Sequence, residues 1–197
     1  MNLILVGLIV FVGAYIIGSF PTGYLVVKLI KGEDIRQIGS GSTGATNVKR
    51  VLGKKGFFGV LLIDAFKGFL PVFIAQKLGM SSIFPIIAST GVIIGHSKSI
   101  FLNFTGGKSV ATSAGVCLAL DWRVALICYV YFAIVSYISK YISLASITVM
   151  LLMILLMWVF GNPLPYLIFC SFVAIYVIYL HRENIKRLLS GTENKVR

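Results

Sequence analysis

Three polar segments of the chain bring together glycines, small hydroxyl side chains and cations. They comprise residues 39–50, 95–112 and 181–187, and each lies at one end of a long apolar run. Backbone N–H groups, hydroxyls and cations are the groups with which proteins bind phosphate. Because a long apolar run crosses a membrane and ends where water begins, we predict a phosphate-handling site beside lipid.

The first segment carries closely spaced glycines, followed by an asparagine and an arginine. Gly39, Gly41 and Gly44 have the spacing of a dinucleotide-binding fingerprint. That motif follows a β-strand, whereas a membrane helix is expected here, so no dinucleotide is predicted. Such glycines still let N–H groups converge on an anion, and Arg50 can hold a phosphate through two hydrogen bonds. Asn47 and Arg50 favour this anion site over a merely flexible loop.

The second segment contains the run Gly-Gly-Lys-Ser at residues 106–109. It is similar to the end of a P-loop, but the first glycine of that motif is replaced by Leu102, so no nucleotide is predicted. Two glycines and a lysine leading into a helix favour anion binding over a simple turn whose lysine sets the topology. His96 is predicted to make a structural hydrogen bond, with a catalytic role as the alternative.

The third segment closes the last apolar run. His181 and Asn184 are three residues apart and are expected to share one helical face, whereas Glu183 and Arg187 are four apart and are expected to pair. A His and an Asn directed at one point indicate a functional site. The alternative is a basic helix end at the membrane interface.

Composition places the chain among integral membrane proteins. Of its 197 residues 58% are hydrophobic and 12% are charged, and the mean hydropathy is +0.96. A soluble domain normally carries about twice that share of charged residues. A formal net charge of +12 would suggest nucleic acid as a partner of a soluble protein, but here the cations cluster in loops. We expect membrane lipid and anionic substrates as partners, and no nucleic acid.

The apolar runs predict an all-α, polytopic membrane protein with about seven transmembrane helices in a single domain, residues 1–197. The expected helices cover residues 3–29, 57–78, 82–97, 109–120, 122–139, 144–160 and 164–182. The fourth is short and contains Thr112, Ser113 and Gly115, so we expect it to be tilted, interior or partly re-entrant. The first run lacks a basic start and exceeds the apolar length of a secretory signal, which predicts a retained helix.

Charge asymmetry predicts the orientation of the chain. Most of the 18 lysines and arginines follow the first, third, fifth and seventh runs, whereas Lys77 and Arg123 lie on the opposite side. Cytoplasmic loops carry the excess of such residues. We therefore expect the N-terminus outside, the C-terminus in the cytoplasm and all three polar segments on the cytoplasmic face.

Two ionisable residues, Asp64 and Lys67, lie inside a predicted span, three apart on one helical face. Ions at that depth usually face the protein interior. A buried pair that fixes helix packing is favoured over a proton or ion path, because no other acid lies at mid-membrane to continue a relay. Cys117, Cys128 and Cys170 lie in apolar runs without metal-ligand spacing, so we expect core or lipid-facing positions.

Together the three segments resemble those of the bacterial membrane acyl-phosphate:glycerol-3-phosphate acyltransferases, the PlsY family, over nearly the whole chain. The first is similar to the family pattern Gly-Ser-Gly-Asn-x-x-Ala-Thr-Asn-x-x-Arg. The second is similar to Gly-His followed by Gly-Gly-Lys-x-Val-Ala-Thr, and the third to the closing family motif. Residues 64–68 and 143–146 also look familial. The chain departs from the family at Ser42 (usually Asn), Ser97-Lys98-Ser99 (an aromatic-proline stretch), Thr105 (a common Lys) and Ser109 (a common Gly).

The resemblance implies transfer of a fatty acyl group from acyl phosphate to the sn-1 hydroxyl of glycerol 3-phosphate. The products would be lysophosphatidic acid and inorganic phosphate, in the first committed step of phospholipid synthesis. Neither acyl-CoA, acyl carrier protein nor any cofactor is implied, and no metal site is predicted. The resemblance also implies a monomer in the bacterial cytoplasmic (inner) membrane, with its active face in the cytoplasm.

By match with the family motifs, each substrate has its own set of residues. Glycerol 3-phosphate would meet Arg50, Lys108, Ser146, His181 and Asn184. The acyl phosphate head would lie on Gly39, Ser40, Gly41, Gly44, Thr46 and Asn47 and on Gly106, Gly107 and Lys108. The candidate catalytic residues are Ser40, Arg50, Lys108, His181 and Asn184. Because the chain has only six carboxylates, we expect a substrate phosphate oxygen to take the hydroxyl proton, with His181 as the competing base.

Two other function classes fit parts of the pattern. A small transporter or channel for a phosphorylated anion would also use helix-end glycines and cations. Against it, the polar groups gather at one face and no inverted repeat is visible. A non-catalytic scaffold that binds anionic lipid through its basic loops would tolerate neutral substitutions at Asn47 and Asn184.

Overall fold

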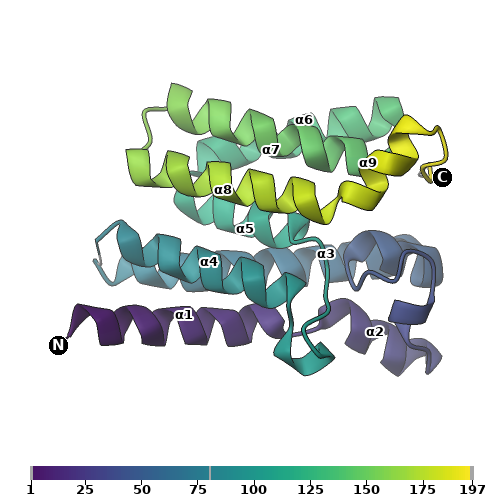
Figure 1. The fold of residues 1–197 in the computed structure, drawn as a ribbon, viewed down its shortest axis with the longest axis horizontal. Coiled ribbons are helices and arrows are strands. Elements are labelled where there is room, and N and C mark those ends of the chain that lie inside the picture. The colour runs from purple at the N-terminus through teal and green to yellow at the C-terminus, as the bar shows by residue number, and fades with distance from the viewer. Residues whose placement is uncertain (1, 80, 196–197) are drawn as a thin grey trace. The chain divides into compact units, whose positions relative to one another are not determined.

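A computed structural model describes residues 2–79 and 81–195 of the chain. Within these residues all regular structure is helical, apart from one isolated β-bridge between Ser99 and Thr105 (Figure 1). The chain divides into two compact units, Met1–Ala119 and Leu120–Arg197. The predicted all-α fold is confirmed.

The first unit holds the first two polar segments, and the second unit holds the third. The helices of the first unit are α1 (Leu3–Ser19), α2 (Thr22–Lys31), the short 3-10 helix η1 (Ile35–Gln37), α3 (Ala45–Lys77), α4 (Ile83–Ser97), the short 3-10 helix η2 (Ile100–Leu102) and α5 (Val110–Leu120). The last residue of α5 is the first of the second unit. The helices of the second unit are α6 (Trp122–Ser139), α7 (Ile142–Val159), α8 (Leu164–Leu180) and α9 (Arg182–Leu189).

The long helices identify the chain as a multi-pass membrane protein. In the described part of the chain, four helical stretches are long and apolar enough to cross a membrane: Leu3–Lys31, Ala45–Lys77, Trp122–Ser139 and Ile142–Val159. The bent pair α8 and α9 makes a fifth when it is counted as one span. Helices α4 and α5 are apolar but shorter. The count of seven spans therefore stays a prediction.

The prediction of one continuous helix over residues 3–29 is wrong, because the helix is interrupted between α1 and α2. Pro21 has no N–H and disfavours a helical backbone at the residue before it. Phe20 accordingly has ψ 116°, and α2 starts at Thr22. High hydropathy continues through this break, which is why the sequence pattern did not reveal it.

Helix α3 begins at Ala45 and not at residue 57 as predicted. Its first turns contain polar residues and glycines, which hid their helical character. Gly53 lies outside helical geometry, with φ 68° and ψ −161°, and so puts a kink into the helix. Because α3 starts at Ala45, Asn47 and Arg50 lie on its first turns, three residues apart, directly after the glycine-rich loop.

The last predicted helix, residues 164–182, ends earlier than expected. Helix α8 stops at Leu180, and α9 leaves it at a bend of 61°. His181 stands at the bend with φ −95° and ψ 6°, and its carbonyl accepts a hydrogen bond from the N–H of Ile185 at 2.9 Å. The bend separates the apolar helix α8 from the short amphipathic helix α9.

Glycines let α1 and α4 lie against each other along their lengths (Figure 1). A Cβ at Gly18 would meet the backbone of Val92, and a Cβ at Gly95 would meet the carbonyl of Tyr15. Small residues allow such close backbone approach in membrane helices. This packing brings the end of α4, which carries His96, to the break that follows α1.

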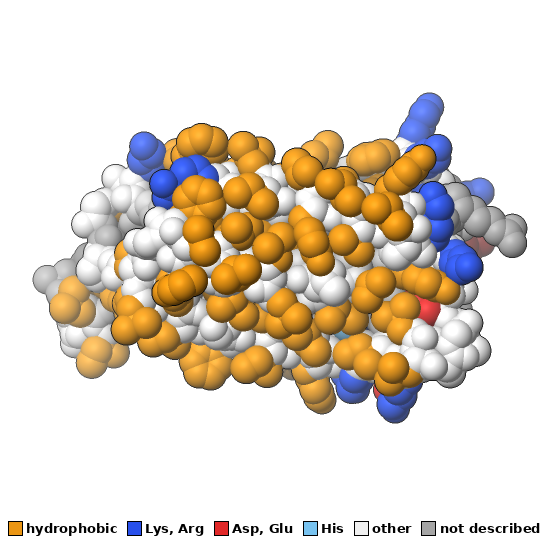
Figure 2. All heavy atoms as spheres, turned by 90° about the horizontal axis from the view of Figure 1, so that it is seen from above, with side chains coloured by type: hydrophobic (Ala, Val, Ile, Leu, Met, Phe, Trp, Pro, Cys, Tyr) orange, Lys and Arg blue, Asp and Glu red, His pale blue; other side chains and the backbone are white. Residues whose placement is uncertain are grey.

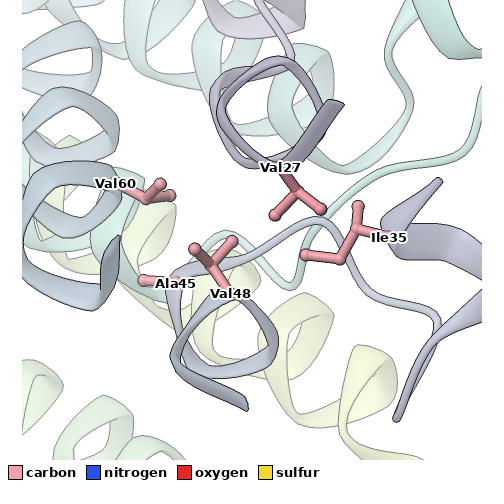
Figure 3. Close-up of a cluster of buried hydrophobic side chains, with 5 residues drawn as sticks. All are labelled: Val27, Ile35, Ala45, Val48 and Val60. Carbon is pink, nitrogen blue, oxygen red and sulfur yellow. The ribbon is translucent and has the colours of Figure 1, made fainter. Parts of the chain in front are cut away.

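A cluster of five buried side chains supports the glycine-rich loop. Val27 of α2, Ile35 of η1 and Ala45, Val48 and Val60 of α3 pack together, each at most 8% exposed (Figure 3). The loop between Gln37 and Ala45 is therefore held at both ends by one core. Elsewhere the surface is largely apolar: Figure 2 shows hydrophobic side chains over most of the face in view, with Lys and Arg lying mainly near its ends.

Candidate active site

The glycine-rich loop turns sharply before α3. Gly39 has φ 60° and Gly41 has φ 69°, which are left-handed conformations that glycine adopts without steric cost. A Cβ at Gly39 would also meet the side-chain oxygen of Asn47 and the side chain of Arg50. The loop thus needs glycine at this position both for its backbone angle and for the space that these two side chains occupy.

Asn47 organises this loop from beneath. Its side-chain Nδ2 donates to the carbonyls of Ile38 at 2.8 Å and Ser42 at 3.0 Å. Its Oδ1 accepts from the backbone N–H of Ser40 at 3.1 Å and from Arg50 at 3.4 Å. Asn47 itself is 1% exposed. Its geometry suits a residue that shapes the loop rather than one that meets a ligand from solvent.

Three candidate residues of the first segment lie within reach of a ligand. Ser40 and Arg50 are exposed, and Thr46 is half-buried in the first turn of α3. Helix α3 starts after Gly44 without a side-chain cap. The first N–H groups of α3 and the positive end of its helix dipole therefore lie at the end of the loop that carries Ser40, an arrangement that favours an anion.

A second cation of this region is already paired. Arg36 on η1 forms an ion pair with Asp34, with 2.7 Å between Nη2 and Oδ2, and its guanidinium lies over the ring of Tyr24. The hydrogen bonds from the Arg36 side chain hold the pKa of the Asp34 carboxyl below its ordinary value. Arg36 is thereby engaged in the fold, unlike the more loosely held Arg50.

The glycines before Lys108 pack directly against His96. The N–H of Gly107 donates to the His96 carbonyl at 3.1 Å. A Cβ at Gly106 would meet that carbonyl, and a Cβ at Gly107 would meet the imidazole Nε2. The two glycines therefore allow the turn to close over the histidine, and the half-buried Lys108 follows just before α5.

Ser109, where the resembled family commonly has glycine, has a left-handed backbone. Its φ is 59°, and it is fully buried. The hydroxyl donates to the carbonyl of Ile93 on α4 at 3.0 Å. This hydrogen bond accompanies a conformation that is unfavourable for any residue with a side chain.

The prediction of a buried Asp64–Lys67 pair is confirmed. The carboxylate and ammonium are 2.8 Å apart, and the two residues are 1% and 6% exposed. Thr22 donates its hydroxyl to Asp64 at 2.9 Å, and Lys67 donates to the Phe20 carbonyl at 2.8 Å. The pair therefore ties α3 to both sides of the break between α1 and α2.

His96 faces this ion pair without a close hydrogen bond. Its Nδ1 is 3.7 Å from Asp64 Oδ1, and among the described residues that buried nitrogen has no hydrogen-bond partner. The predicted side-chain hydrogen bond is therefore absent at Nδ1, and the contact of His96 with the glycine turn is made by its carbonyl and ring. A small polar pocket is lined by Thr22, Thr43, Asp64, Lys67, His96 and Ser99. The first two polar segments thus meet at one pocket of the first unit.

In the second unit, His181 is buried at the bend between α8 and α9. Its Nδ1 lies 2.8 Å from the carbonyl oxygen of Val177. A carbonyl can only accept, so Nδ1 carries a proton, and in the neutral form of the ring Nε2 is the unprotonated nitrogen. A base or a hydrogen-bond acceptor at Nε2 is the chemistry that this tautomer provides.

Sequence reasoning missed Glu193, which lies beyond the third segment and connects it to α7. Its carboxylate accepts hydrogen bonds from Asn184 at 2.7 Å, Arg187 at 2.7 Å and Ser143 at 2.9 Å. Partial burial raises the pKa of this carboxyl, but these hydrogen bonds outweigh burial and leave the pKa below its ordinary value. The tail beyond α9 is thereby fixed against α7.

The expected ion pair between Glu183 and Arg187 is wrong. Arg187 instead pairs with Glu193 at 2.7 Å, and Glu183 pairs with Lys186 at 3.1 Å. The acidic residue of the tail is more shielded and therefore a better partner. Its only sequence signal was a lone carboxylate soon after a basic helix.

Ser146, a candidate contact of glycerol 3-phosphate, is 1% exposed on α7. Its hydroxyl donates to the carbonyl of Ile142 at 2.8 Å, one turn earlier, which leaves oxygen lone pairs for a further contact. Cys117, Cys128 and Cys170 are buried and are not joined by disulfides, as expected for core positions. In the described residues no group of three or more His, Cys, Asp or Glu could hold a metal ion.

Comparison with known families extends over most of the chain. A sequence profile described as "Glycerol-3-phosphate acyltransferase" matches residues 8–191, a range that contains all three polar segments. A glycerol-3-phosphate acyltransferase of Trichormus variabilis is 47% identical over 204 residues, covering 95% of this chain and 90% of that protein. One of Synechococcus sp. is 47% identical over 184 residues, covering 93% of this chain and 90% of that protein.

Two solved structures are similar in fold. One is a crystal structure of PlsY, an integral membrane glycerol 3-phosphate acyltransferase, in its glycerol 3-phosphate form. It has a TM-score of 0.93 and 39% identity, and the match covers 97% of this chain and 96% of that one. The other is the lysophosphatidic acid form, with a TM-score of 0.89, 36% identity and coverage of 97% and 95%.

Proposed function

The chain belongs to the glycerol-3-phosphate acyltransferase family, and from this premise we propose that it transfers a fatty acyl group from acyl phosphate to the sn-1 hydroxyl of glycerol 3-phosphate. The hydroxyl oxygen forms a bond to the acyl carbon, the bond from that carbon to the phosphate oxygen breaks, and lysophosphatidic acid and inorganic phosphate result. The observation that carries the proposal is the family match over residues 8–191, which includes every candidate residue. This match favours acyl transfer over anion transport.

The two substrates call for the two kinds of surface that the chain carries. Glycerol 3-phosphate is a soluble dianion, and acyl phosphate joins an anionic head to a lipid tail. Each tail methylene transferred from water into an apolar environment contributes about 0.8 kcal/mol. Each charge-assisted hydrogen bond to a phosphate contributes about 1.5–3 kcal/mol. Apolar helices that end in glycine-rich, cationic segments can therefore bind both substrates.

We assign a set of residues to each substrate, with Lys108 shared by both sets. Glycerol 3-phosphate is held by Arg50, Lys108, Ser146, His181 and Asn184. The acyl phosphate head is held by Gly39, Ser40, Gly41, Gly44, Thr46, Gly106, Gly107 and Lys108. Asn47 acts by shaping the loop, because its amide is already committed to loop carbonyls and to the Ser40 N–H. The exposure of Ser40 and Arg50 supports direct contact for both of them.

A phosphate oxygen of a substrate takes the proton of the attacking hydroxyl. Acyl phosphate is already an activated donor, so orientation of the hydroxyl against the carbonyl supplies much of the rate. His181 is the competing base, through Nε2 of the tautomer that Val177 fixes. In the substrate-base mechanism, His181→Ala weakens binding of glycerol 3-phosphate but leaves kcat and its pH profile unchanged. A loss of kcat together with the acidic limb of that profile, where protonation would inactivate a base, would identify His181 as the base.

The enzyme acts at the cytoplasmic face of a bacterial inner membrane. We propose seven spans in a single domain and a monomer, with the N-terminus outside and the C-terminus inside. Helices α4 and α5 add to the longer spans in this topology, and the distribution of cations supports its orientation. Arg50, Lys108 and His181 then share one side of the lipid barrier. Membrane-impermeant thiol labelling of single cysteines at these positions tests this, and labelling from opposite sides would contradict it.

The reaction is tested with purified protein and measurement of phosphate release. Acyl phosphate with glycerol 3-phosphate should give phosphate and lysophosphatidic acid, whereas acyl-CoA in place of acyl phosphate should give no product. Uptake of labelled glycerol 3-phosphate into sealed vesicles without an acyl donor would instead favour a transporter.

Removal of the phosphate-binding cations should abolish turnover in a folded protein. Arg50→Ala and Lys108→Ala are each expected to reduce kcat/KM by roughly 100-fold or more, because each removes a charge-assisted contact to a substrate phosphate. Lys54→Ala, at an exposed cation four residues beyond Arg50, is the matched control and should stay near wild type. Equal effects of Arg50→Ala and Lys54→Ala would point to general surface charge instead.

A further inference from the structure

The connection between α4 and α5 displays three large apolar side chains. Ile100, Phe101 and Phe104 are 51%, 58% and 58% exposed, whereas Leu102 between them is 6% exposed and anchors the turn. We refer to Ile100, Phe101 and Phe104 as the apolar tip. Contiguous apolar exposure on a loop marks a surface that contacts a partner or a membrane.

The backbone holds the apolar tip in a defined shape. Ser99 and Thr105 form an isolated β-bridge that closes the loop, and the N–H of Phe104 donates to the Ser99 carbonyl at 2.8 Å. Asn103 and Phe104 both have left-handed backbones, with φ 53° and 58°. A bulky residue rarely adopts this conformation, and such strain is retained where the displayed side chains have a role. The apolar tip is therefore a turn with a defined backbone conformation.

The loop is tethered to the last turns of α1. The hydroxyl of Ser99 donates to the Ser19 carbonyl at 2.5 Å, and the hydroxyl of Tyr15 donates to the Lys98 carbonyl at 2.7 Å. Figure 1 shows the loop beside the junction of α1 and α2. Helix α1 has 17 residues and so is about 25 Å long, close to the hydrocarbon thickness of a bilayer. The apolar tip thus lies at the level where the span ends.

We propose that the apolar tip inserts into the lipid leaflet at the end of α1, with its side chains among the acyl chains. The exposed Lys98 next to the tip then lies at the level of the anionic headgroups, where a cation is stabilised. Lipid is favoured over a protein partner because the loop that carries the tip is hydrogen-bonded to the last turns of α1. There Ile16, Ile17 and the following Phe20 are themselves exposed apolar side chains, at 50%, 37% and 50%. The insertion depends on the chain being a membrane protein and not on the reaction that it catalyses.

Insertion of the tip also fixes the depth of the second polar segment relative to the membrane. Gly106 follows the tip after one residue, and the turn to Lys108 is closed against His96. The tip on one side and α5 on the other therefore hold this glycine turn at the headgroup level. A phosphate that is attached to an acyl chain lies at the same level.

Site-directed spin labelling tests the insertion on the full chain in vesicles of phosphatidylcholine and phosphatidylglycerol. Nitroxides are attached at Phe101→Cys and, separately, at Phe104→Cys, and the accessibility to oxygen is compared with that to a water-soluble nickel chelate. Leu8→Cys, 58% exposed on α1, is the lipid reference, and Gln37→Cys, exposed on η1, is the aqueous reference. The native cysteines are buried, and unmutated protein gives the background labelling.

Insertion predicts several-fold greater accessibility to oxygen than to the nickel chelate at both tip positions, as at Leu8. Greater accessibility to the chelate, as at Gln37, would overturn the proposal. Exclusion of both reagents with dipolar broadening would also overturn it, since a second copy of the chain would then cover the tip. Where either variant fails to fold, the same label at Ile100→Cys decides between the same outcomes.

Discussion

At the scale of the residue, Ser109 combines an unfavourable backbone with a useful hydroxyl. Its φ of 59° would suit glycine, and its hydroxyl bonds to the Ile93 carbonyl at 3.0 Å. Ser109→Ala keeps the left-handed backbone but loses the hydrogen bond, so it should destabilise by about 1 kcal/mol. Ser109→Gly loses the same bond but relieves the backbone, so it should remain close to wild type. Thermal unfolding in detergent should rank the glycine variant above the alanine variant.

Ser171→Ala supplies the control for Ser109. Ser171 also bonds to a backbone carbonyl, that of Leu167 at 2.9 Å, but from the regular helix α8. Alanine is a better helix former than serine, so Ser171→Ala should be neutral or slightly stabilising. An alanine variant at Ser109 that is as stable as the glycine variant would contradict the assigned backbone.

The same residue shows what the sequence could and could not predict. The departure from a common family glycine at Ser109 was visible in the sequence. The sign of its φ and its hydrogen bond to α4 depend on how the turn closes over His96, which is a tertiary contact. Asn47 shows the same limit, because its type and position indicated a site but its role as the support of the loop required the carbonyls of Ile38 and Ser42.

At the scale of the element, the packing of α1 on α4 depends on individual glycines. A Cβ at Gly18 would meet the backbone of Val92, whereas a Cβ at Gly13 on the same helix would meet nothing within 4 Å. Gly18→Ala should therefore force the helices apart and destabilise by about 1–3 kcal/mol. Gly13→Ala should leave the unfolding temperature unchanged or slightly raised. Equal unfolding temperatures for the two variants would argue against this interface.

Part of this interface had an overlooked signal in the sequence. Gly91 and Gly95 are four residues apart in an apolar run, a spacing typical of closely packed membrane helices. The partner helix could not be predicted, since many runs carry glycines. The helix breaks were missed for a similar reason. The break at Pro21 and the bend at His181 are local changes of the backbone, and hydropathy averaged over a long run does not reveal them. The ends of the expected helices over residues 82–97, 109–120, 122–139 and 144–160 agree with the structure to within two residues.

At the scale of the whole molecule, composition was sufficient to predict a helical membrane protein, whereas among its six carboxylates only the pairing of Asp64 was predicted correctly. Asp34, Asp121 and Glu193 lie outside the spanning helices, and each has a lowered pKa. For Asp121 the side-chain hydrogen bonds from Arg123 are the largest cause, and they lower its pKa from 3.8 to about 2. The hydrogen bonds that lower these three pKa values are held in place by the folded chain, so the pKa shifts depend on the folded state.

The lowered pKa values predict loss of stability in acid. A carboxyl whose pKa is lower in the folded state stabilises that state at pH values above its unfolded pKa. This contribution to stability declines as the pH falls through the pKa of the carboxyl in the unfolded state, and it is lost below its pKa in the folded state. For Asp121 the window runs from pH 3.8 down to about 2. For Glu193 it begins near pH 4.5 and extends lower. The unfolding temperature in detergent should therefore fall progressively once the pH drops below about 5.

Glu193→Gln tests how much of this acid sensitivity comes from the tail. At neutral pH the variant should lose about 1 kcal/mol, because an amide accepts more weakly from Arg187 and from Asn184, and the site is partly solvated. That loss corresponds to a fall in unfolding temperature of about 2–4 °C for a chain of this size. The gap to wild type should then narrow as the pH falls from 5 to 3, since the carboxyl takes up a proton in the unfolded state and the wild type loses its advantage. Glu33→Gln, at an exposed carboxylate after α2, should follow the wild-type curve throughout. A gap between Glu193→Gln and wild type that stays constant over this range would mean that the carboxylate charge contributes nothing and that only the shape of the side chain matters.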